Sequence, residues 1–279
     1  MTTPWQVHWD SPADGRYNMA KDALLLQRAA EEGTAALRLY AWDRITLSVG
    51  RAQKVERQVD LGACAAHGIP VVRRETGGRA VLHGSDLTYS IAAPLGGPRF
   101  AGGILGIYRE ISEAFLHFFA GLGLGPECKA YAGRERAESA SPVCFVTPSA
   151  FEILLRGKKV VGSAQRQVPR AFLQHGSIPL EPQQRLLSEL FQAADAGQIA
   201  AQMTDLRGEG CYPRHSVEDL RRRLVDSFGA VFGLAFAPAP WTPADEAAVA
   251  ERTAQFPWIG PGAAAAAPAA VNQTGTPRS

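Results

Sequence analysis

The spacing of apolar residues divides the chain into strands in its middle and helices toward both ends. Apolar residues recur every three or four positions over 104–122, which predicts a long helix with one buried stripe. A helix over 19–32, with Asn18 as its N-cap, and a shorter helix over 59–67 are predicted from similar signals. From Pro182 onward the pattern is again mostly helical, with helix-start signals near residues 216 and 242.

Short runs rich in β-branched and aromatic residues predict strands over 36–41, 45–49, 69–74, 86–92 and 172–180. Apolar residues also alternate with Glu152 and Arg156, which predicts a half-buried strand that turns at Gly157 into a partner strand. Hairpins occur, and strands do not alternate regularly with helices. The expected fold class is therefore α+β, with mixed, largely antiparallel sheets flanked by helices.

Composition sets limits on domains and partners. With 279 residues, 46% of them hydrophobic, the chain can bury a full core. One catalytic domain is expected over 1–258, followed by a disordered Ala/Pro-rich tail over 259–279. A net charge of +2 argues against a nucleic-acid partner. No apolar run approaches the roughly 20 residues of a membrane span, and the first residues resemble no secretory signal, so a cytoplasmic location without membrane contact is expected.

Four cysteines are present, at positions 64, 128, 144 and 211. None forms a C-x-x-C pair, and no His/Cys cluster has zinc-site spacing, so no metal is expected. Cys64 lies in an apolar helical turn and is expected to be a packing residue. Cys144 differs from the others because it follows a polar, small-residue segment over 130–142 that is typical of a mobile loop.

Two segments could carry chemistry. The first, Arg73-Arg74-Glu75-Thr76-Gly77-Gly78-Arg79-Ala80-Val81-Leu82-His83, joins adjacent glycines to three arginines and a histidine. Such a turn lets backbone N–H groups approach a carbonyl or phosphate beside fixed cations. The second contains Cys144 and, fifteen residues later, Lys159, just before Gly162-Ser163-Ala164. A cysteine attacks as its thiolate, so a neighbouring cation that lowers its pKa raises its reactivity, and together these groups indicate acyl transfer.

Each of these candidate residues can also be interpreted as purely structural. On spacing alone, an ordinary buried Cys144 and a solvated turn Lys159 are favoured over a catalytic pair, and the Arg73-Arg74 pair fits a solvated strand end. His83 fits a turn histidine bonded to the backbone better than a group that assists proton transfer. For His175, a structural or substrate-shaping role is as good an interpretation as a general base.

Several motifs together resemble the lipoate ligase/octanoyltransferase superfamily, and most closely its LipM-type octanoyltransferases. They are residues 18–25 (NMAKDALL), 73–90 (RRETGGRAVLHGSDLTYS), Cys144-Phe145, 157–165 (GKKVVGSAQ) and 174–177 (QHGS). The resemblance extends from about residue 5 to about residue 255. The glycine motif is shared with ligases, whereas Cys144-Phe145 followed by Pro148, Ser149 and Glu152 is the feature typical of the transferases. The chain departs from the transferase pattern at residues 20–23 and at Val146.

The resemblance implies a fold like the catalytic domain of biotin and lipoate ligases, and an acyl-thioester intermediate on Cys144. It implies that Lys159 lowers the pKa of this thiol. The acyl and pantetheine side of the cleft would be lined by Arg73, Arg74, Gly77, Gly78 and Arg79, with His83 as a further substrate-binding candidate. Backbone N–H groups of Gly162, Ser163 and Ala164 would face the acyl carbonyl.

The function expected from this resemblance is transfer of octanoyl from acyl carrier protein to a lysine of a lipoyl-domain protein, such as the glycine cleavage H protein, without ATP or another cofactor. Three alternatives remain: an ATP-dependent lipoate ligase, octanoyl transfer between two lipoyl-domain proteins, and a non-catalytic acyl- or carrier-binding protein. Little sequence follows residue 255, so the extra C-terminal domain common among bacterial ligases is not expected. A biotin ligase is disfavoured because the chain has no Gly-Arg-Gly-Arg run.

Overall fold

The computed structural model describes residues 5–97, 99–100, 102–130, 151–191 and 195–260. The expected mobile loop, Cys144, and all but the first two residues of the expected tail lie outside these ranges. In the part of the chain that the structure describes, no helix is both long and apolar enough to cross a membrane.

A six-stranded sheet forms the centre of the molecule, in the order β10-β11-β6-β2-β1-β12. Its strands are β1 (Trp5–Ala13), β2 (Ala36–Trp42), β6 (Asp86–Pro94), β10 (Gly162–Val168), β11 (Ala171–Pro179) and β12 (Phe236–Pro238). Strand β1 runs parallel to β2 and β12, and the remaining pairs are antiparallel. The prediction of a mixed, largely antiparallel sheet is therefore confirmed.

Two smaller sheets flank the central one. The first has the order β13-β4-β3-β5, with β3 (Thr46–Val49), β4 (Val71–Arg73), β5 (Val81–His83) and β13 (Trp258–Ile259). The second is formed by β7 (Pro126–Ala130), β8 (Phe151–Leu155) and β9 (Lys158–Lys159). The glycine turn of residues 74–80 connects β4 to β5, so it belongs to the first of these sheets.

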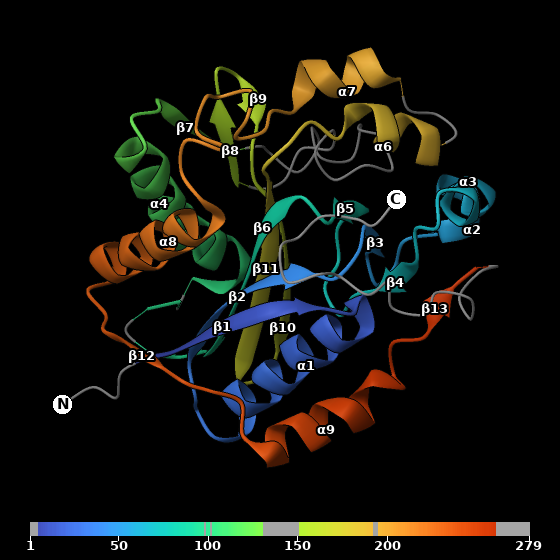
Figure 1. Cartoon of the computed structure of the whole chain (residues 1–279). Helices are drawn as coiled ribbons and strands as arrows, with labels where there is room; N and C mark the ends of the chain where they lie inside the picture. The colour runs from blue at the N-terminus through green and yellow to red at the C-terminus, as the bar shows by residue number, and fades with distance from the viewer. Residues whose placement is uncertain (1–4, 98, 101, 131–150, 192–194, 261–279) are drawn as a thin grey trace.

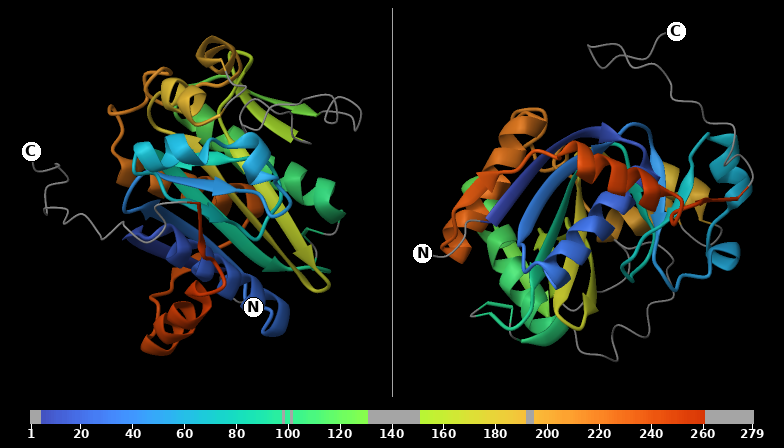
Figure 2. Two further views of the ribbon diagram at one scale, coloured as in Figure 1. Left: turned by 90° about the vertical axis from the view of Figure 1, so that its right-hand side faces the viewer. Right: turned by 90° about the horizontal axis from the view of Figure 1, so that it is seen from below.

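Helices cover both faces of the central sheet (Figures 1 and 2). On one face lie α1 (Gly15–Glu31) and α9 (Pro243–Thr253); on the other lie α4 (Gly103–Gly121) and α8 (Val217–Phe232). The short helices are α2 (Val55–Gln58), α3 (Leu61–Ala66), α6 (Gln184–Leu190) and α7 (Ala196–Gln202). The predicted apolar stripe of α4 is buried except at its start, where Ile104 is exposed. Ile107, Phe115 and Phe118 join the main core cluster with Phe228 of α8 and Phe172 of β11.

The start of the first helix differs from the prediction. Asp14 is the N-cap, and its carboxylate accepts hydrogen bonds from the backbone N–H groups of Arg16 and Tyr17. Asn18 lies inside the helix instead, where its side chain donates to the carbonyl of Ala41 and accepts from Arg38. The prediction of Asn18 as the N-cap is therefore wrong: its side chain connects the helix to the sheet.

Candidate active site

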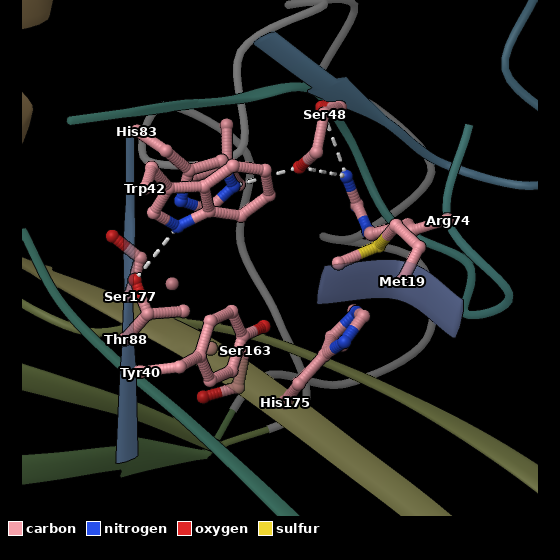
Figure 3. Close-up of a pocket in the computed structure, with 14 residues that line it drawn as sticks. Met19, Tyr40, Trp42, Ser48, Arg74, His83, Thr88, Ser163, His175 and Ser177 are labelled. Atoms are coloured by element: carbon pink, nitrogen blue, oxygen red, sulfur yellow. Dashed lines mark hydrogen bonds between the residues drawn. The ribbon is translucent and has the colours of Figure 1, made fainter. Parts of the chain in front are cut away.

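The two segments singled out in the sequence meet at one cavity between the central sheet and the β3–β4–β5 sheet. Residues that line it include Arg74 and His83 from the first segment and Gly162, Ser163 and Ala164 from the second. Met19 of α1 reaches in beside Arg74, and Tyr40, Trp42 and Val81 supply further apolar wall (Figure 3). The cavity therefore has apolar side chains and polar groups in the same wall, as ligand sites commonly do.

The glycine turn packs closely against its neighbours. A Cβ added at Gly50 would lie 2.1 Å from the carbonyl oxygen of Gly78, so Gly50 permits an approach that another residue would block. Gly78 itself has φ +82°, and an added Cβ there would lie 3.4 Å from Cβ of Ala164. The first segment therefore contacts the edge of the central sheet directly.

Arg74 holds this turn in shape. It is 3% exposed, and its Nη2 donates to the carbonyls of Gly77 and Arg79, both at 2.7 Å. Its Nη1 donates to the carbonyl of Ser48 on β3 at 3.0 Å. Because these bonds join the ends of two strands to the turn, Arg74 determines where the turn lies against the cavity.

The other candidates of the first segment are placed differently. Nη1 of Arg73 donates to the carbonyls of Gly50, Arg51 and Gln53 at 2.8–3.2 Å, so its guanidinium braces the neighbouring 50–53 loop. Arg79 and Gly77 are partly exposed and Gly78 is exposed. A role for these residues on the acyl and pantetheine side of the cleft stays a prediction.

His83 is buried and forms a chain of hydrogen bonds. Its Nε2 lies 2.8 Å from Oγ of Ser48, and its Nδ1 lies 2.7 Å from Oδ2 of Asp86. The ring stacks on Trp42, with 4.0 Å between the ring centroids (Figure 3). Burial alone would raise the pKa of the Asp86 carboxyl. The charge of His83 and the hydrogen bonds from His83, Gly84 and Ser177 outweigh burial, so the pKa of Asp86 lies below its usual value. The plainer interpretation, a turn histidine bonded to the backbone, is wrong, because His83 ends strand β5 and its two ring nitrogens lie against side chains.

His175 forms a second chain of the same kind. Its Nε2 lies 2.6 Å from Oγ1 of Thr76, and its Nδ1 lies 2.9 Å from Oδ2 of Asp22. Burial lowers the pKa of His175; the Asp22 carboxylate opposes this shift and the Arg74 guanidinium adds to it. The imidazole is therefore neutral at neutral pH. Arg74 joins the two chains, since it donates to Oγ1 of Thr76 through Nε and to Oγ of Ser48 through Nη1, both at 3.2 Å.

Strand β10 presents the predicted carbonyl-binding segment. Gly162, Ser163 and Ala164 pair with Ser177, Gly176 and His175 of β11. Within the described residues β10 is an edge strand, and every second N–H group of an antiparallel edge strand points away from its partner. The Ser163 side chain is held by the Tyr89 hydroxyl at 2.8 Å. That these N–H groups bind an acyl carbonyl stays a prediction, and the edge geometry is compatible with it.

Lys159 is not a solvated turn residue. The β8–β9 hairpin turns at Arg156 and Gly157, both with positive φ, and pairs Leu154 with Lys159. Glu152 lies two residues before Leu154, hence on the same face as Lys159. Their side chains are 6% and 2% exposed, and Nζ of Lys159 lies 2.6 Å from Oε1 of Glu152. The prediction that β8 turns at Gly157 is confirmed, but Glu152 is buried, so the strand is not half-buried as predicted.

Cys144 lies outside the described residues, as do Pro148 and Ser149. Residues 131–150 connect Ala130 of β7 to Phe151 of β8, and these two residues pair with one another. Burial raises the pKa of Cys64 to about 11 and also raises the pKa of Cys211. Cys128 is exposed, and partial desolvation of its thiol raises its pKa as well, so none of the three is shifted toward its thiolate.

Several site residues were missed in the sequence: Asp22, Ser48, Thr76, Asp86 and Trp42. Asp86 follows His83 by three residues, and this spacing was the one local signal for an imidazole–carboxylate pair. Asp22 and Ser48 are brought to the site only by packing of α1 and β3, so no local pattern marks them.

Comparison with known proteins places the chain in context. Residues 14–229 match the family model of the lipoyl protein ligase A/B catalytic domain. The octanoyltransferase LipM of Kyrpidia tusciae is 34% identical over 89% of this chain and 94% of its own length, and that of Oceanobacillus iheyensis is 32% identical over 87% and 90%. The octanoyltransferase LipM of Carboxydothermus hydrogenoformans is 42% identical over 168 residues, which cover 60% of this chain and 61% of that protein.

Solved structures show the same fold at lower identity. A lipoate-protein ligase A bound with ATP superposes with a TM-score of 0.75 at 20% identity, over 91% of this chain and 95% of its own. The protein Ta0514 of T. acidophilum with bound lipoic acid gives a TM-score of 0.74 at 20% identity, over 91% and 96%. The expected likeness to lipoate ligase catalytic domains is confirmed at the level of fold.

Proposed function

The chain belongs to the family of lipoyl protein ligase A/B catalytic domains, and we propose that it is an octanoyltransferase that works through a thioester on Cys144. Octanoyl transfer is the activity of the LipM relatives that align over 87–89% of this chain. The observation in the structure that supports a thiol mechanism best is Lys159. Its ammonium is buried and paired with the buried carboxylate of Glu152. Lys159 follows Cys144 by fifteen residues and precedes strand β10 of the cavity by three, and a cation in this place suits stabilisation of a thiolate.

The reaction has two steps. The Cys144 thiolate attacks the carbonyl carbon of the octanoyl thioester on its donor, a carbon–sulfur bond forms to Cys144, and the donor leaves as its thiolate. The amine of the acceptor lysine then attacks the new thioester, a carbon–nitrogen bond forms, and Cys144 leaves as its thiolate with loss of a proton from nitrogen. In both steps negative charge develops on the carbonyl oxygen, which the outward N–H groups of β10 would stabilise.

We assign the donor as octanoyl-acyl carrier protein and the acceptor as a lipoyl-domain protein, such as the glycine cleavage H protein. The second step yields a stable amide from a thioester, so the transfer runs downhill without ATP. A lipoate ligase needs ATP because its substrate is a free acid. The structural match to ligases at 20% identity concerns the fold alone, so the chemistry must be tested directly.

The test is intact mass spectrometry after mixing the protein with octanoyl-acyl carrier protein in the absence of nucleotide. We expect an octanoyl adduct that hydroxylamine removes, and transfer of octanoyl to an added lipoyl domain. Cys144→Ala should lose adduct and transfer, whereas Cys128→Ala, which removes an exposed thiol, should retain both. ATP-dependent attachment of free lipoate by Cys144→Ala would establish a ligase instead.

A further inference from the structure

Basic residues are concentrated in two short segments of the chain. Residues 51–58 and 73–79 contain six arginines and lysines but only two acids, Glu56 and Glu75, whereas the whole chain has 29 basic and 27 acidic residues. Outside these two segments, acidic residues therefore outnumber basic ones. Positive charge that gathers in one region of a protein attracts partners of the opposite charge.

The two segments lie side by side in the structure. Strand β3 ends just before the first segment and pairs parallel with β4, so that Val49 is opposite Arg73. The backbone N–H of Arg51 donates to the carbonyl of Thr76 at 2.9 Å, and the guanidinium of Arg73 donates to three carbonyls of the 50–53 loop. The two segments therefore contribute to one region of the surface, around the glycine turn.

Arg51, Lys54 and Arg57 form a basic patch at α2 and just before it. All three side chains are exposed, and none of them forms an ion pair with another residue that the structure describes. Exposed arginines elsewhere differ: Arg222 of α8 lies 2.6 Å from the carboxylate of Glu218, one helical turn away. The basic patch thus presents three charges that no carboxylate within the described ranges neutralises.

The basic patch lies beside the cavity. The glycine turn, to which Arg51 is bonded, reaches the cavity wall, because a Cβ added at Gly78 would lie 3.4 Å from Cβ of Ala164. Arg166 follows Ala164 by two residues, hence on the same face of β10, and it pairs with Glu75 of the turn. Burial lowers the pKa of Arg166, and the positive charge of Arg51 lowers it further, so these two cations are within electrostatic reach of each other. Positive charge therefore extends from α2 to the edge of the cavity.

The two partners of the proposed reaction differ in the charge of the group that they bring to the cavity. The donor presents octanoyl on a phosphopantetheine arm, whose phosphodiester is an anion, and an acyl carrier protein is itself acidic. The acceptor presents a lysine, which approaches through water as a cation. A basic patch attracts the first and repels the reacting group of the second. Its charge therefore fits the donor.

We propose that Arg51, Lys54 and Arg57 are the docking surface for the acidic face of the acyl carrier protein that donates octanoyl. The inference rests on the proposed function, which names this donor but no surface that binds the carrier protein. Exposed charges of this kind raise the rate of encounter and fix the orientation of the partner. Docking at the patch would thus place the phosphopantetheine arm beside the cavity, and it makes or breaks no covalent bond.

The test begins with the variant Arg51→Gln/Lys54→Gln/Arg57→Gln, called the patch variant. It removes three charges from exposed positions and changes no residue that lines the cavity. Glutamine is a good helix former, so α2 should be retained.

The control variant is Arg214→Gln/Arg222→Gln/Arg223→Gln. It lowers the net charge of the protein by the same amount at exposed positions on α8 and just before it. Helices α2 and α8 lie on opposite sides of the molecule (Figure 1). A difference between the two variants therefore reports the position of the lost charges, and not their number.

Binding is measured with acyl carrier protein that has its phosphopantetheine arm but no acyl group, so that no reaction follows. At an ionic strength of about 0.1 M, where the Debye length is about 10 Å, the patch variant should bind at least about tenfold more weakly than the wild type. At about 1 M, where the Debye length is about 3 Å, the two affinities should agree within about twofold. The control variant should stay within about twofold of the wild type at both ionic strengths.

Acyl-enzyme formation is then followed by intact mass with two donors. With limiting octanoyl-acyl carrier protein, the patch variant should be slowed by about the factor lost in binding. Octanoyl-pantetheine has neither phosphate nor carrier protein, so it should acylate the wild type and both variants at similar rates. Transfer from isolated acyl-enzyme to a lipoyl domain should also be the same in all three proteins.

Four results would each overturn the inference. They are wild-type affinity in the patch variant, equal weakening in the control variant, equal slowing with octanoyl-pantetheine, and equal slowing of transfer to the lipoyl domain. Binding of a DNA oligonucleotide as tightly as the acyl carrier protein would also overturn it and assign the patch to nucleic acid. Should the patch variant fail to fold, the three single variants decide, and each should weaken binding by about twofold. Failure of the proposed function is distinct, since the wild-type protein would then bind the carrier protein but form no acyl-enzyme.

Discussion

The buried pair of Lys159 and Glu152 makes a quantitative prediction possible. With 2.6 Å between Nζ and Oε1 and an effective dielectric constant of about 20, the attraction is about 6 kcal/mol. Both side chains are almost excluded from water, and breaking a buried ion pair by removing one partner typically costs about 3–5 kcal/mol of stability. Glu152→Gln and Lys159→Gln should therefore each lower the free energy of unfolding by about this amount.

The double variant should be much less destabilised than the sum of the two single variants. Two neutral amides leave no buried charge, and replacement of both partners is often close to neutral. We expect a coupling energy of at least about 2 kcal/mol from urea unfolding of the four proteins in a double-mutant cycle.

The matched control is Arg222 and Glu218 on α8, which also lie 2.6 Å apart but are 66% and 71% exposed. Solvent screens this pair, so its cycle should give about 0.3–0.5 kcal/mol. Equal coupling in both pairs would show that burial does not matter here. Additive effects of Glu152→Gln and Lys159→Gln, within about 0.5 kcal/mol, would refute the ion pair as a stabilising unit.

Three further predictions follow from single contacts. Lys159→Gln should move the alkylation of Cys144 by iodoacetamide to higher pH. A shift of one pH unit would mean about 1.4 kcal/mol of lost thiolate stabilisation. An unchanged dependence of alkylation on pH would show that Lys159 does not stabilise the thiolate. Gly50→Ala should displace the glycine turn, because its Cβ would meet the Gly78 oxygen at 2.1 Å, so acyl-enzyme formation should fall. Gly121→Ala is the control and should spare it, because no atom lies within 4 Å of the added Cβ. His8 is buried against Trp241, and burial lowers its pKa from 6.5 to about 4. Between these pH values the unfolded state binds one proton more, so the free energy of unfolding falls as pH falls, by about 3 kcal/mol in all. His8→Phe should lack this pH-dependent part in urea unfolding, and a pH dependence identical to that of the wild type would contradict the prediction.

The elements that sequence predicted well are those with a strong local pattern. The α4 stripe, the α8 start at Ser216 and the β8–β9 turn at Gly157 each have a repeat or a breaker that acts within a few residues. Residues of both candidate segments line one cavity, but the substrate-binding roles that the superfamily resemblance implied for them stay predictions.

The elements that were missed depend on distant partners. Strands β12 and β13 have three and two residues, and they exist because β1 and β4 offer edges to pair with. Buried charges were missed for a related reason. The burial of Arg38 was not predicted: its guanidinium is fully buried, and Asp10 and Asp22 each lie 2.7 Å from it.

The positions of these groups suggest how one fold can serve two reaction classes. The cavity is built from residues of the central sheet and of the β3–β4–β5 sheet, beside the glycine turn of residues 74–80. Lys159 and Glu152 belong to the third sheet, and Cys144 lies in the segment that connects two paired residues of that sheet. Under the proposed function, the thiol chemistry would depend on the β7–β9 unit, and binding of the acyl group would depend on the cavity walls formed by the other two sheets. On this argument, substitutions in the cavity should alter which acyl group or acceptor is used, and substitutions in the third sheet should alter whether a covalent acyl-enzyme forms.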